Sequence, residues 1–204
     1  MVRINKEYHR DAKNKIIAVA LEIATENGWN AVTLEAISLK IGVTPSALYT
    51  YYENRDELMQ EVFLEVMRKI RGNIISHLSN KDLEAHEVLE YFADNFYTKK
   101  NPISSVFMQS LASIAQDPRF RDQVAAHYAE NIKSIDKLFL HLQKKGQIPA
   151  NVSTASAARA VYGLTMGLGL ISFMQQTDRR DTKKIWVDAV ERILLVGTVT
   201  KRTE

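Results

Sequence analysis

Residues 33–58 read TLEAISLKIGVTPSALYTYYENRDEL, and this stretch predicts two short helices joined by a tight turn. Thr33 is placed to cap the first helix, whose apolar residues then recur at roughly helical spacing. Gly42 follows the last of them, and glycine adopts the left-handed conformation that ends a helix at little cost. The apolar residues of this first helix are Leu34, Ile37 and Ile41.

The chain re-enters a helix at Thr44-Pro45, which combines a hydroxyl cap with a proline at the first helical position, where no amide donor is lost. Because the turn is only a few residues long, the second helix should cross the first at a steep angle. Asn54 and Glu57 then form a capping-box-like start for a third, longer helix. The expected shared core of the first two helices is Ile37, Val43 and Leu48.

Six side chains of the second helix are expected to point outward: Pro45, Ser46, Ala47, Tyr49, Thr50 and Tyr51. Small side chains near a helix start let the backbone lie close to base edges, while hydroxyl and methyl groups can contact bases or phosphates. A helical hairpin buried in a protein core is the alternative, but tyrosines and threonines would be unusual core residues. The pattern therefore predicts a helix-turn-helix unit that enters DNA.

The stretch from about residue 13 to residue 58 resembles the DNA-binding domain of the tetracycline-repressor (TetR) family of transcription regulators. A preceding helix ends at Asn27-Gly28-Trp29, and the stretch closes on Asn54-Arg55-Asp56-Glu57-Leu58. Two departures keep the chemistry, since Tyr52 stands where phenylalanine is commoner and Arg55 where lysine is commoner. Between its ends the resemblance rests on Thr33, Ile37, Gly42-Val43-Thr44, Leu48-Tyr49 and Tyr52.

The resemblance implies an all-α fold with an N-terminal three-helix helix-turn-helix DNA-binding domain over residues 1–58. A connector helix and a C-terminal helical ligand-binding and dimerisation domain follow over residues 59–204. The family's base contacts usually come from the helix that here spans residues 44–51. The resemblance assigns phosphate anchoring to Thr33, Thr44, Tyr49, Tyr51 and Arg55. It assigns base reading to Pro45, Ser46, Ala47 and Thr50.

Composition is compatible with this interpretation without proving it. The chain has 204 residues, of which 46% are hydrophobic, so it can bury a core for one large or two small domains. It has no cysteine, which excludes disulfides and thiolate metal sites and fits a reducing cytoplasm. Residues 1–15 are polar and charged, unlike a signal peptide. We expect a cytoplasmic protein.

Positive charge is concentrated at the N-terminus, although the net charge of the chain is only +3. A basic arm of this kind can follow the phosphate backbone of DNA and make affinity salt-dependent. A solvated tail would have the same composition, so both interpretations stay open. The basic residues are Arg3, Lys6, Arg10, Lys13 and Lys15, against the acidic residues Glu7 and Asp11.

Helices are also expected in the rest of the chain. Apolar residues at helical spacing predict a first helix around residues 16–24 and a long connector helix from residue 56 to about residue 78. Prolines with their capping residues mark the later breaks. No stretch alternates with period two over enough residues to predict a sheet. The expected C-terminal helices cover residues 83–99, 102–116, 118–145, 153–176 and 182–200.

The segment 160–174 is apolar around most of its circumference. A surface helix of a monomer should instead have one polar face. The uninterrupted apolar run of this segment is shorter than the roughly 20 residues that a bilayer needs, so we expect no membrane partner. Gly163 and Gly167 permit a close helix contact, and the resembling family pairs its last two helices with those of a second copy. We expect a homodimer through the last two helices; an internal core helix of a monomer is the alternative.

The resemblance also implies a small-molecule cavity in the C-terminal domain. Its effector is expected to be hydrophobic or amphipathic, and no cofactor is expected. The candidate lining consists of aromatic and apolar side chains on several helices: Phe92, Phe96, Phe107, Met108, Leu111, Tyr128, Phe139, Tyr162, Met166 and Phe173. Candidate polar selectors are Gln109, His127, Tyr128 and Asn131.

The sequence contains no pattern that predicts catalysis. Serine-elbow, phosphate-loop and cysteine-nucleophile motifs are all missing. Two groups of acidic and histidine side chains occur at helical spacing, and neither is diagnostic of a metal site: Glu84, His86, Glu87 and Glu90, and His127 with Glu130. We expect a ligand-responsive repressor that leaves a palindromic operator when its effector binds. The alternatives are a constitutive or partner-regulated dimeric DNA-binding protein and, more distantly, a ligand-sequestering protein without DNA binding.

Overall fold

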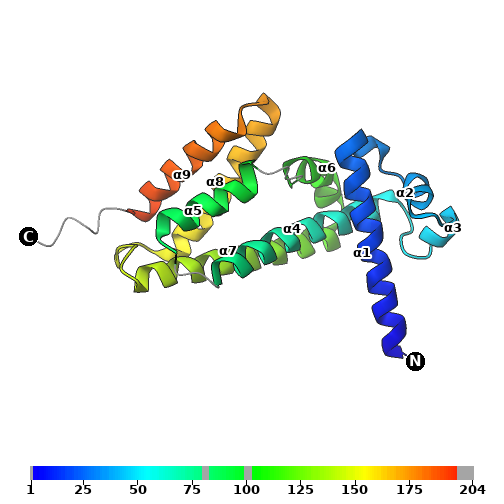
Figure 1. The fold of residues 1–204 in the computed structure, drawn as a ribbon, viewed down its shortest axis with the longest axis horizontal. Helices are drawn as coiled ribbons and strands as arrows, with labels where there is room; N and C mark the ends of the chain where they lie inside the picture. The colour runs from blue at the N-terminus through cyan, green and yellow to red at the C-terminus, as the bar shows by residue number, and fades with distance from the viewer. Residues whose placement is uncertain (1, 80–82, 99–102, 197–204) are drawn as a thin grey trace, which may run out of the picture. The chain divides into compact units, whose positions relative to one another are not determined.

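The computed structural model describes residues 2–79, 83–98 and 103–196, without the side chains of residues 2–6, 73–79, 98, 103, 104 and 179. These ranges contain helices and turns but no strand, and the all-α prediction is confirmed (Figure 1). By contacts the chain forms two compact units, Met1–Val66 with Val106–Arg121 and Met67–Ser105 with Asp122–Glu204. We call them the head unit and the body unit. The functional boundary at residue 58 stays a prediction.

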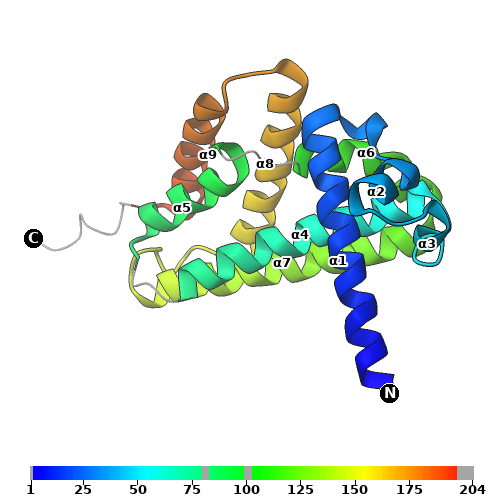
Figure 2. The ribbon, with the colours of Figure 1, turned by 45° about the vertical axis from the view of Figure 1, so that its right-hand side comes forward.

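The head unit is built from the first four helices and from a later segment of the chain. Helix α1 lies against α2, and α2 lies against α3 (Figures 1 and 2). The helix expected around residues 16–24 extends back to Val2, so the basic N-terminal segment is helical rather than an extended arm. The elements are α1 (Val2–Asn27), η1 (Trp29–Ala31), α2 (Leu34–Ile41), α3 (Pro45–Leu48), the start of α4 (Arg55–Ser79), most of α6 (Ile103–Gln116) and the first turn of α7 (Pro118–Lys144).

The two ends of α2 agree with the sequence prediction. Thr33 Oγ1 accepts a hydrogen bond from the Ala36 N–H at 3.0 Å, which caps the helix start. Gly42 ends the helix with a φ of 82°, the left-handed conformation. The N–H groups of Gly42 and Val43 both donate to the Ser38 carbonyl at 3.0 Å, so this terminal carbonyl is satisfied.

The caps of α3 and α4 differ from the prediction in detail. Thr44 makes no capping hydrogen bond, because its Oγ1 lies 3.0 Å from Ser46 Oγ and the two hydroxyls bond to each other. Before α4, Asn54 Oδ1 accepts from the Glu57 N–H at 2.9 Å, as expected. Glu57 Oε2, however, accepts from the Glu53 N–H at 2.7 Å, one residue earlier than in a capping box.

The core between α2 and α3 contains two of the three predicted residues. Ile37 and Leu48 are 0% and 2% exposed, whereas Val43 is 42% exposed, so its placement in the core was wrong. Val43 directly follows the left-handed glycine, where the chain has left the helix and the helical periodicity no longer applies. Tyr52 is buried in the head core, and Lys13 Nζ lies 4.8 Å from the centroid of its ring.

Arg55, the first residue of α4, ties this helix to the turn between α1 and α2. Its Nε donates to the Val32 carbonyl at 2.8 Å, and its Nη2 donates to the Trp29 carbonyl at 2.7 Å. Hydrogen bonds from a charged group contribute about 1.5–3 kcal/mol each. The guanidinium reaches both carbonyls because its donors form a planar fork. Arg55 therefore fixes how α4 begins.

The body unit contains the remaining helices. Helices α8 and α9 lie side by side and are joined by a short turn (Figures 1 and 2). The helix expected over residues 83–99 changes after Ala93 into a π-helical turn. The last helix ends at Leu194, and its expected continuation from residue 197 to residue 200 lies outside the described residues. The elements are α5 (Ala85–Ala93), η2 (Asp94–Thr98), most of α7, α8 (Thr154–Gln175) and α9 (Arg179–Leu194).

Trp186 on α9 joins the other elements of the body core. It is 1% exposed, and its indole stacks on Phe92 with the ring centroids 5.4 Å apart. Its Nε1 donates to Thr165 Oγ1 at 2.9 Å, and the Tyr97 hydroxyl donates to the Thr165 carbonyl at 3.0 Å. The buried polar groups around the indole are thus paired, as in most protein cores.

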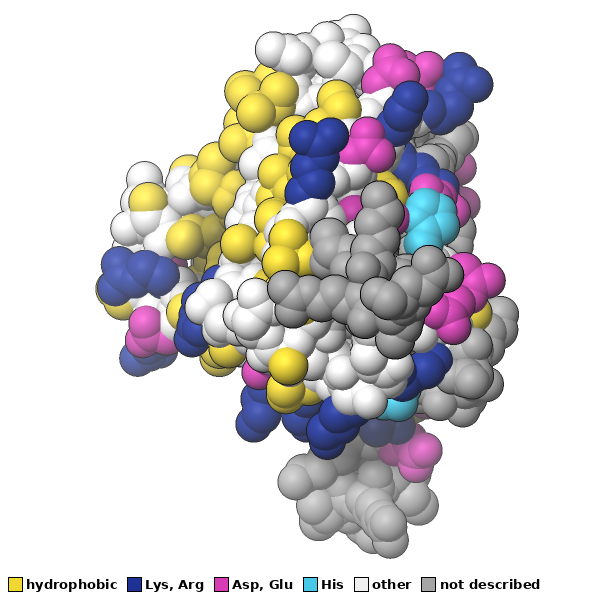
Figure 3. All heavy atoms as spheres, turned by 90° about the vertical axis from the view of Figure 1, so that its left-hand side faces the viewer, with side chains coloured by type: hydrophobic (Ala, Val, Ile, Leu, Met, Phe, Trp, Pro, Cys, Tyr) yellow, Lys and Arg dark blue, Asp and Glu magenta, His cyan; other side chains and the backbone are white. Residues whose placement is uncertain are grey.

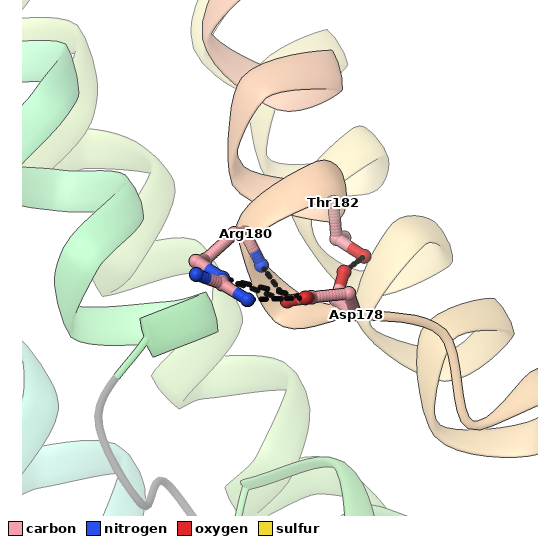
Figure 4. A network of polar contacts seen from close by, with 3 residues as sticks. All are labelled: Asp178, Arg180 and Thr182. Carbon is pink, nitrogen blue, oxygen red and sulfur yellow. Dashed lines mark hydrogen bonds and ion pairs between the residues drawn. The ribbon is translucent and has the colours of Figure 1, made fainter.

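Helix α9 begins at Arg179 and not at residue 182, because Asp178 caps it. The Asp178 carboxylate accepts from the Arg180 N–H at 2.8 Å and binds the Arg180 guanidinium at 3.0 Å (Figure 4). Thr182 Oγ1 donates to the Asp178 carbonyl at 3.2 Å. Aspartate is among the favoured N-cap residues, and it adds one turn to the predicted helix.

Replacing Arg55 with lysine keeps the positive charge but removes the forked pair of donors. We expect Arg55→Lys to lower the unfolding free energy of the head unit by about 2 kcal/mol, because one of two charge-assisted hydrogen bonds is lost. Chemical denaturation followed by Trp29 fluorescence measures this change. Arg121→Lys, at an exposed position of the same unit, is the control. Equal unfolding free energies for both variants would show that the contact does not hold the head together.

Candidate nucleic-acid interface

The head unit exposes a set of small, hydroxyl-bearing and aromatic side chains on α3 and the turn after it. We call this set the α3 surface, and it consists of Pro45, Ser46, Ala47, Tyr49, Thr50 and Tyr51. Tyr49 is 50% exposed, whereas Ala47 and Tyr51 are half-buried. The side chains expected to point outward therefore lie at the surface. Their binding to DNA stays a prediction.

Helix α3 is shorter than the helix predicted over residues 44–51. Beyond Leu48 the chain turns, and the N–H groups of Tyr51 and Tyr52 both donate to the Leu48 carbonyl, at 2.9 and 3.1 Å. Thr50 Oγ1 donates to the Ala47 carbonyl at 2.7 Å, and a threonine hydroxyl bound to the backbone in this way competes with helix formation. The last three residues of the α3 surface therefore lie on a turn.

A carboxylate of α2 holds the hydroxyl of Tyr49, which donates to Glu35 Oε1 at 3.1 Å. A hydrogen bond from its own backbone and the bond from Tyr49 lower the pKa of Glu35, and the same side-chain bond raises the pKa of Tyr49. A phenol has one hydrogen to donate. Tyr49 can therefore donate to a phosphate only by leaving Glu35, a residue that sequence reasoning did not identify.

The hydroxyl groups of the head differ in what they can still bind. Thr33 Oγ1 accepts from the backbone and keeps its hydrogen for another partner. The Thr50 hydroxyl donates its hydrogen to the Ala47 carbonyl, so its oxygen can only accept a hydrogen bond from DNA. The amino groups of adenine and cytosine are donors that need such an acceptor. The hydroxyls of Thr44 and Ser46 are hydrogen-bonded to each other, so only one of their two hydrogens is still available for DNA.

The ring of Tyr51 packs against α1. Its centroid lies 4.7 Å from that of His9, with 40° between the ring planes. His9 is exposed and borders the α3 surface. No spacing in the sequence marked this histidine, because the contact depends on how α1 packs against the turn after α3.

Several basic side chains of the head are already engaged. Lys13 Nζ binds Glu61 at 2.7 Å, and Lys40 binds two glutamates of α1, each at 3.0 Å. Arg55 donates to two backbone carbonyls, so only its remaining N–H groups are available for the predicted phosphate contact. The side chains of Arg3 and Lys6 lie outside the described part. The exposed basic residues of the predicted arm are Arg10 and Lys15.

The candidate effector residues are divided between the two units, and their role stays a prediction. The head unit holds Phe107, Met108, Leu111 and the polar Gln109. The body unit holds Phe92, Phe96, Tyr128, Phe139, Tyr162, Met166, Phe173 and the polar His127 and Asn131. Phe139 is 2% exposed and belongs to the core, whereas Phe173 is 48% exposed. Among the described residues, no group of three His, Cys, Asp or Glu side chains is placed to hold a metal ion.

Helices α8 and α9 leave a broad apolar face exposed. Figure 3, seen from the side of α9 in Figure 1, shows hydrophobic side chains gathered in a band. Helix α8 is long and apolar enough to cross a membrane by length and composition, and 28% of that stretch is buried. A contiguous exposed apolar face often marks an interaction site. The large exposed side chains are Ile171 (46%), Phe173 (48%), Met174 (59%) and Ile185 (56%).

Comparison with known proteins agrees with this geometry. Residues 16–62, which include α2, α3 and Arg55, match the family model described as "Bacterial regulatory proteins, tetR family". The transcriptional regulator UidR of Escherichia coli strain K12 is 18% identical over 159 residues, 76% of this chain and 79% of that protein. The nicotine-responsive repressor HdnoR of Paenarthrobacter nicotinovorans is 22% identical over 173 residues, 83% of this chain and 88% of that protein.

A solved structure shows the same fold. A transcriptional regulator from Saccharomonospora viridis in complex with choline superposes with a TM-score of 0.73 at 16% identity, covering 89% of this chain and 96% of that chain. The relatives are named as transcriptional regulators, a class of DNA-binding proteins that are not enzymes. The family match over residues 16–62, the relatives and the fold thus agree, and together they support a TetR-family transcriptional regulator.

Proposed function

We propose that this regulator is a cytoplasmic repressor that binds a palindromic operator as a homodimer. A small hydrophobic or amphipathic effector releases it. The observation that carries the proposal is the α3 surface, where small and hydroxyl-bearing side chains are exposed. The hydrogen bonds of Arg55 stabilise the head unit that presents this surface. Such small and hydroxyl-bearing side chains let a backbone approach base edges while hydroxyls bind phosphates.

The contacts divide into those that position the head and those that read sequence. Phosphate contacts fix the register of a protein on DNA, and contacts with base edges carry the sequence information. The proposed phosphate contacts come from Thr33, Thr44, Tyr49, Tyr51 and Arg55. The proposed base contacts come from Pro45, Ser46, Ala47 and Thr50.

The exposed face of α8 and α9 supports a homodimer. Gly163 is exposed on α8, and no atom lies within 4 Å of the position that a Cβ would take there. A second copy could therefore approach this helix closely. A two-fold dimer presents two recognition elements to successive major grooves, about 34–36 Å apart.

Helix α4 supports coupling between an effector and DNA, because its first part belongs to the head unit and its later part to the body unit. Among the relatives, one is a nicotine-responsive repressor and another was solved with choline. For release, the effector must bind the conformer that does not fit the operator more tightly, by about 1–3 kcal/mol.

Two isosteric substitutions separate phosphate binding from base reading. Tyr49→Phe should weaken binding to operator and to unrelated duplex alike, by at most about fivefold, because one phosphate hydrogen bond of about 1 kcal/mol is lost in the complex and the bond to Glu35 is lost in the free protein. Thr50→Val should reduce the ratio of operator to unrelated affinity by about tenfold, since one base contact is worth about 1–3 kcal/mol. Fluorescence anisotropy at one fixed salt concentration measures both. Equal effects of the two substitutions on this ratio would contradict the division of roles.

Enlarging a glycine tests the dimer interface. Gly163→Leu should convert the dimer to a monomer and weaken operator binding, because the new side chain blocks the close contact between helices. Gly72→Leu is the matched control, since Gly72 is also exposed, helical and free of atoms within 4 Å of an added Cβ. Sedimentation measures the mass of each variant. A dimer in both variants would exclude this face as the interface.

Effector and operator should oppose each other reciprocally. A bound effector should lower operator affinity by about 5–150-fold, and saturating operator should lower effector affinity by the same factor. Anisotropy measures the first change, and tryptophan fluorescence of the protein measures the second. An operator affinity that no hydrophobic or amphipathic compound alters would favour the constitutive or partner-regulated alternative.

A further inference from the structure

Three polar side chains of the body unit meet between α7 and α8. The rings of Tyr128 and Tyr162 lie edge to face with their centroids 5.5 Å apart. Asn131 Nδ2 donates to the Tyr162 hydroxyl oxygen over 3.4 Å, a long hydrogen bond. We call these three residues the α7–α8 polar cluster.

The cluster has more hydrogen-bonding capacity than its described neighbours use. Asn131 Oδ1 is buried and accepts no hydrogen bond from a described residue. Within the same part of the chain, the hydroxyls of Tyr128 and Tyr162 have no acceptor for their hydrogens. His127, one turn before Asn131, likewise has a buried Nδ1 that no described group pairs. Protein cores leave few buried polar atoms unpaired, so Asn131 Oδ1 and His127 Nδ1, one turn apart, need an explanation.

The two tyrosines of the cluster are poorly solvated, and no charged side chain contributes to the shift of either pKa. Burial raises the pKa of Tyr128 to about 12 and also raises the pKa of Tyr162. Burial, together with the nearby Arg71 cation, lowers the pKa of His127, so the imidazole is neutral at pH 7. Arg71 itself is paired with Glu130. An ion placed here without a counter-charge would lose its hydration at high cost.

An uncharged group that both donates and accepts hydrogen bonds matches these atoms. Asn131 Oδ1 needs a donor, and each phenol has one hydrogen to give. An alcohol hydroxyl or a primary carboxamide supplies a hydrogen and lone pairs at once. A carboxylate has no hydrogen for Oδ1, and an ammonium group has no lone pair for the phenols.

We infer that Tyr128, Asn131 and Tyr162 bind the uncharged polar group, a hydroxyl or a carboxamide, of a small hydrophobic ligand. The inference rests on the effector binding of the proposed function and names the class of ligand that the body unit selects. Val161 on α8 and Ile135 on α7, each within one turn of a cluster residue, are buried and apolar. Buried apolar side chains thus neighbour the cluster along both helices.

Four ligands with one chain length and different head groups test this selection. Decan-1-ol and decanamide should bind the wild type at least tenfold more tightly than decanoate and decylammonium, because only the first two both donate and accept. Trp186 fluorescence reports binding, since its indole is fixed to Thr165, three residues from Tyr162. Thermal shift provides a second readout. Equal or tighter binding of the two ions would overturn the inference.

Two variants assign the selection to the cluster. Tyr162→Phe and Asn131→Leu should each reduce affinity for decan-1-ol by about tenfold and leave that for decanoate unchanged. An equal loss of affinity for decan-1-ol and decanoate, or no loss for either compound, would show that the head group of the ligand binds elsewhere.

Thermal stability separates a ligand site from an ordinary buried network. Asn131→Leu should raise the Tm by about 2–4 °C, because it removes a buried carbonyl oxygen that lacks a donor. Thr165→Val is the matched control, since the Thr165 hydroxyl accepts from Trp186 and donates to the Val161 carbonyl. It should lower the Tm. A lower Tm in both variants would show that Asn131 Oδ1 is satisfied in the free protein, for example by water, and would overturn the inference.

The failure of this inference and that of the proposed function give different results. Decan-1-ol that binds in a cluster-dependent way without changing operator affinity would refute effector-controlled release and leave the ligand site intact. No binding by any of the four compounds would overturn the ligand site. The operator affinity of the wild type would still test DNA binding on its own.

Discussion

The head unit depends on the contact of the Arg55 guanidinium with the carbonyls of Trp29 and Val32. The carbonyls lie between α1 and α2, and Arg55 begins α4, so the contact links the two ends of the segment that contains α3. Ile37 and Leu48 pack inside this segment and leave the α3 surface outside. Helix α4 continues into the body unit. In the proposed mechanism, a conformational change of the body unit would therefore reach the head unit through this contact.

Sequence reasoning succeeded in the head where the determining contacts are local. The Thr33 cap depends on a residue three positions away, and its position follows from residue type. Val43 was misplaced because helical periodicity was carried past a left-handed glycine. The bond from Tyr49 to Glu35 and the carbonyl contacts of Arg55 join residues 14 to 26 positions apart, and no local pattern reports such pairs.

In the body, the sequence predicts the helices better than it predicts which side chains they bury. Phe139 and Phe173 have the same side chain, yet one lies in the core and the other is half exposed. Helix α8 is apolar on most of its circumference, so its pattern does not tell the inward face from the outward face. Asn131 was named as one of several polar selectors, but its unpaired oxygen depends on how α7 meets α8.

Two copies of the α3 surface are proposed to read one operator with two-fold symmetry. Selection of binding sites from random duplex DNA by the 204-residue chain tests this most directly, because the recovered sequences report both symmetry and spacing. We expect a palindromic motif whose half-sites are centred about 10–10.5 base pairs, or a multiple of that, apart. A motif without two-fold symmetry, or no enrichment over the starting pool, would contradict the proposed mode of DNA binding.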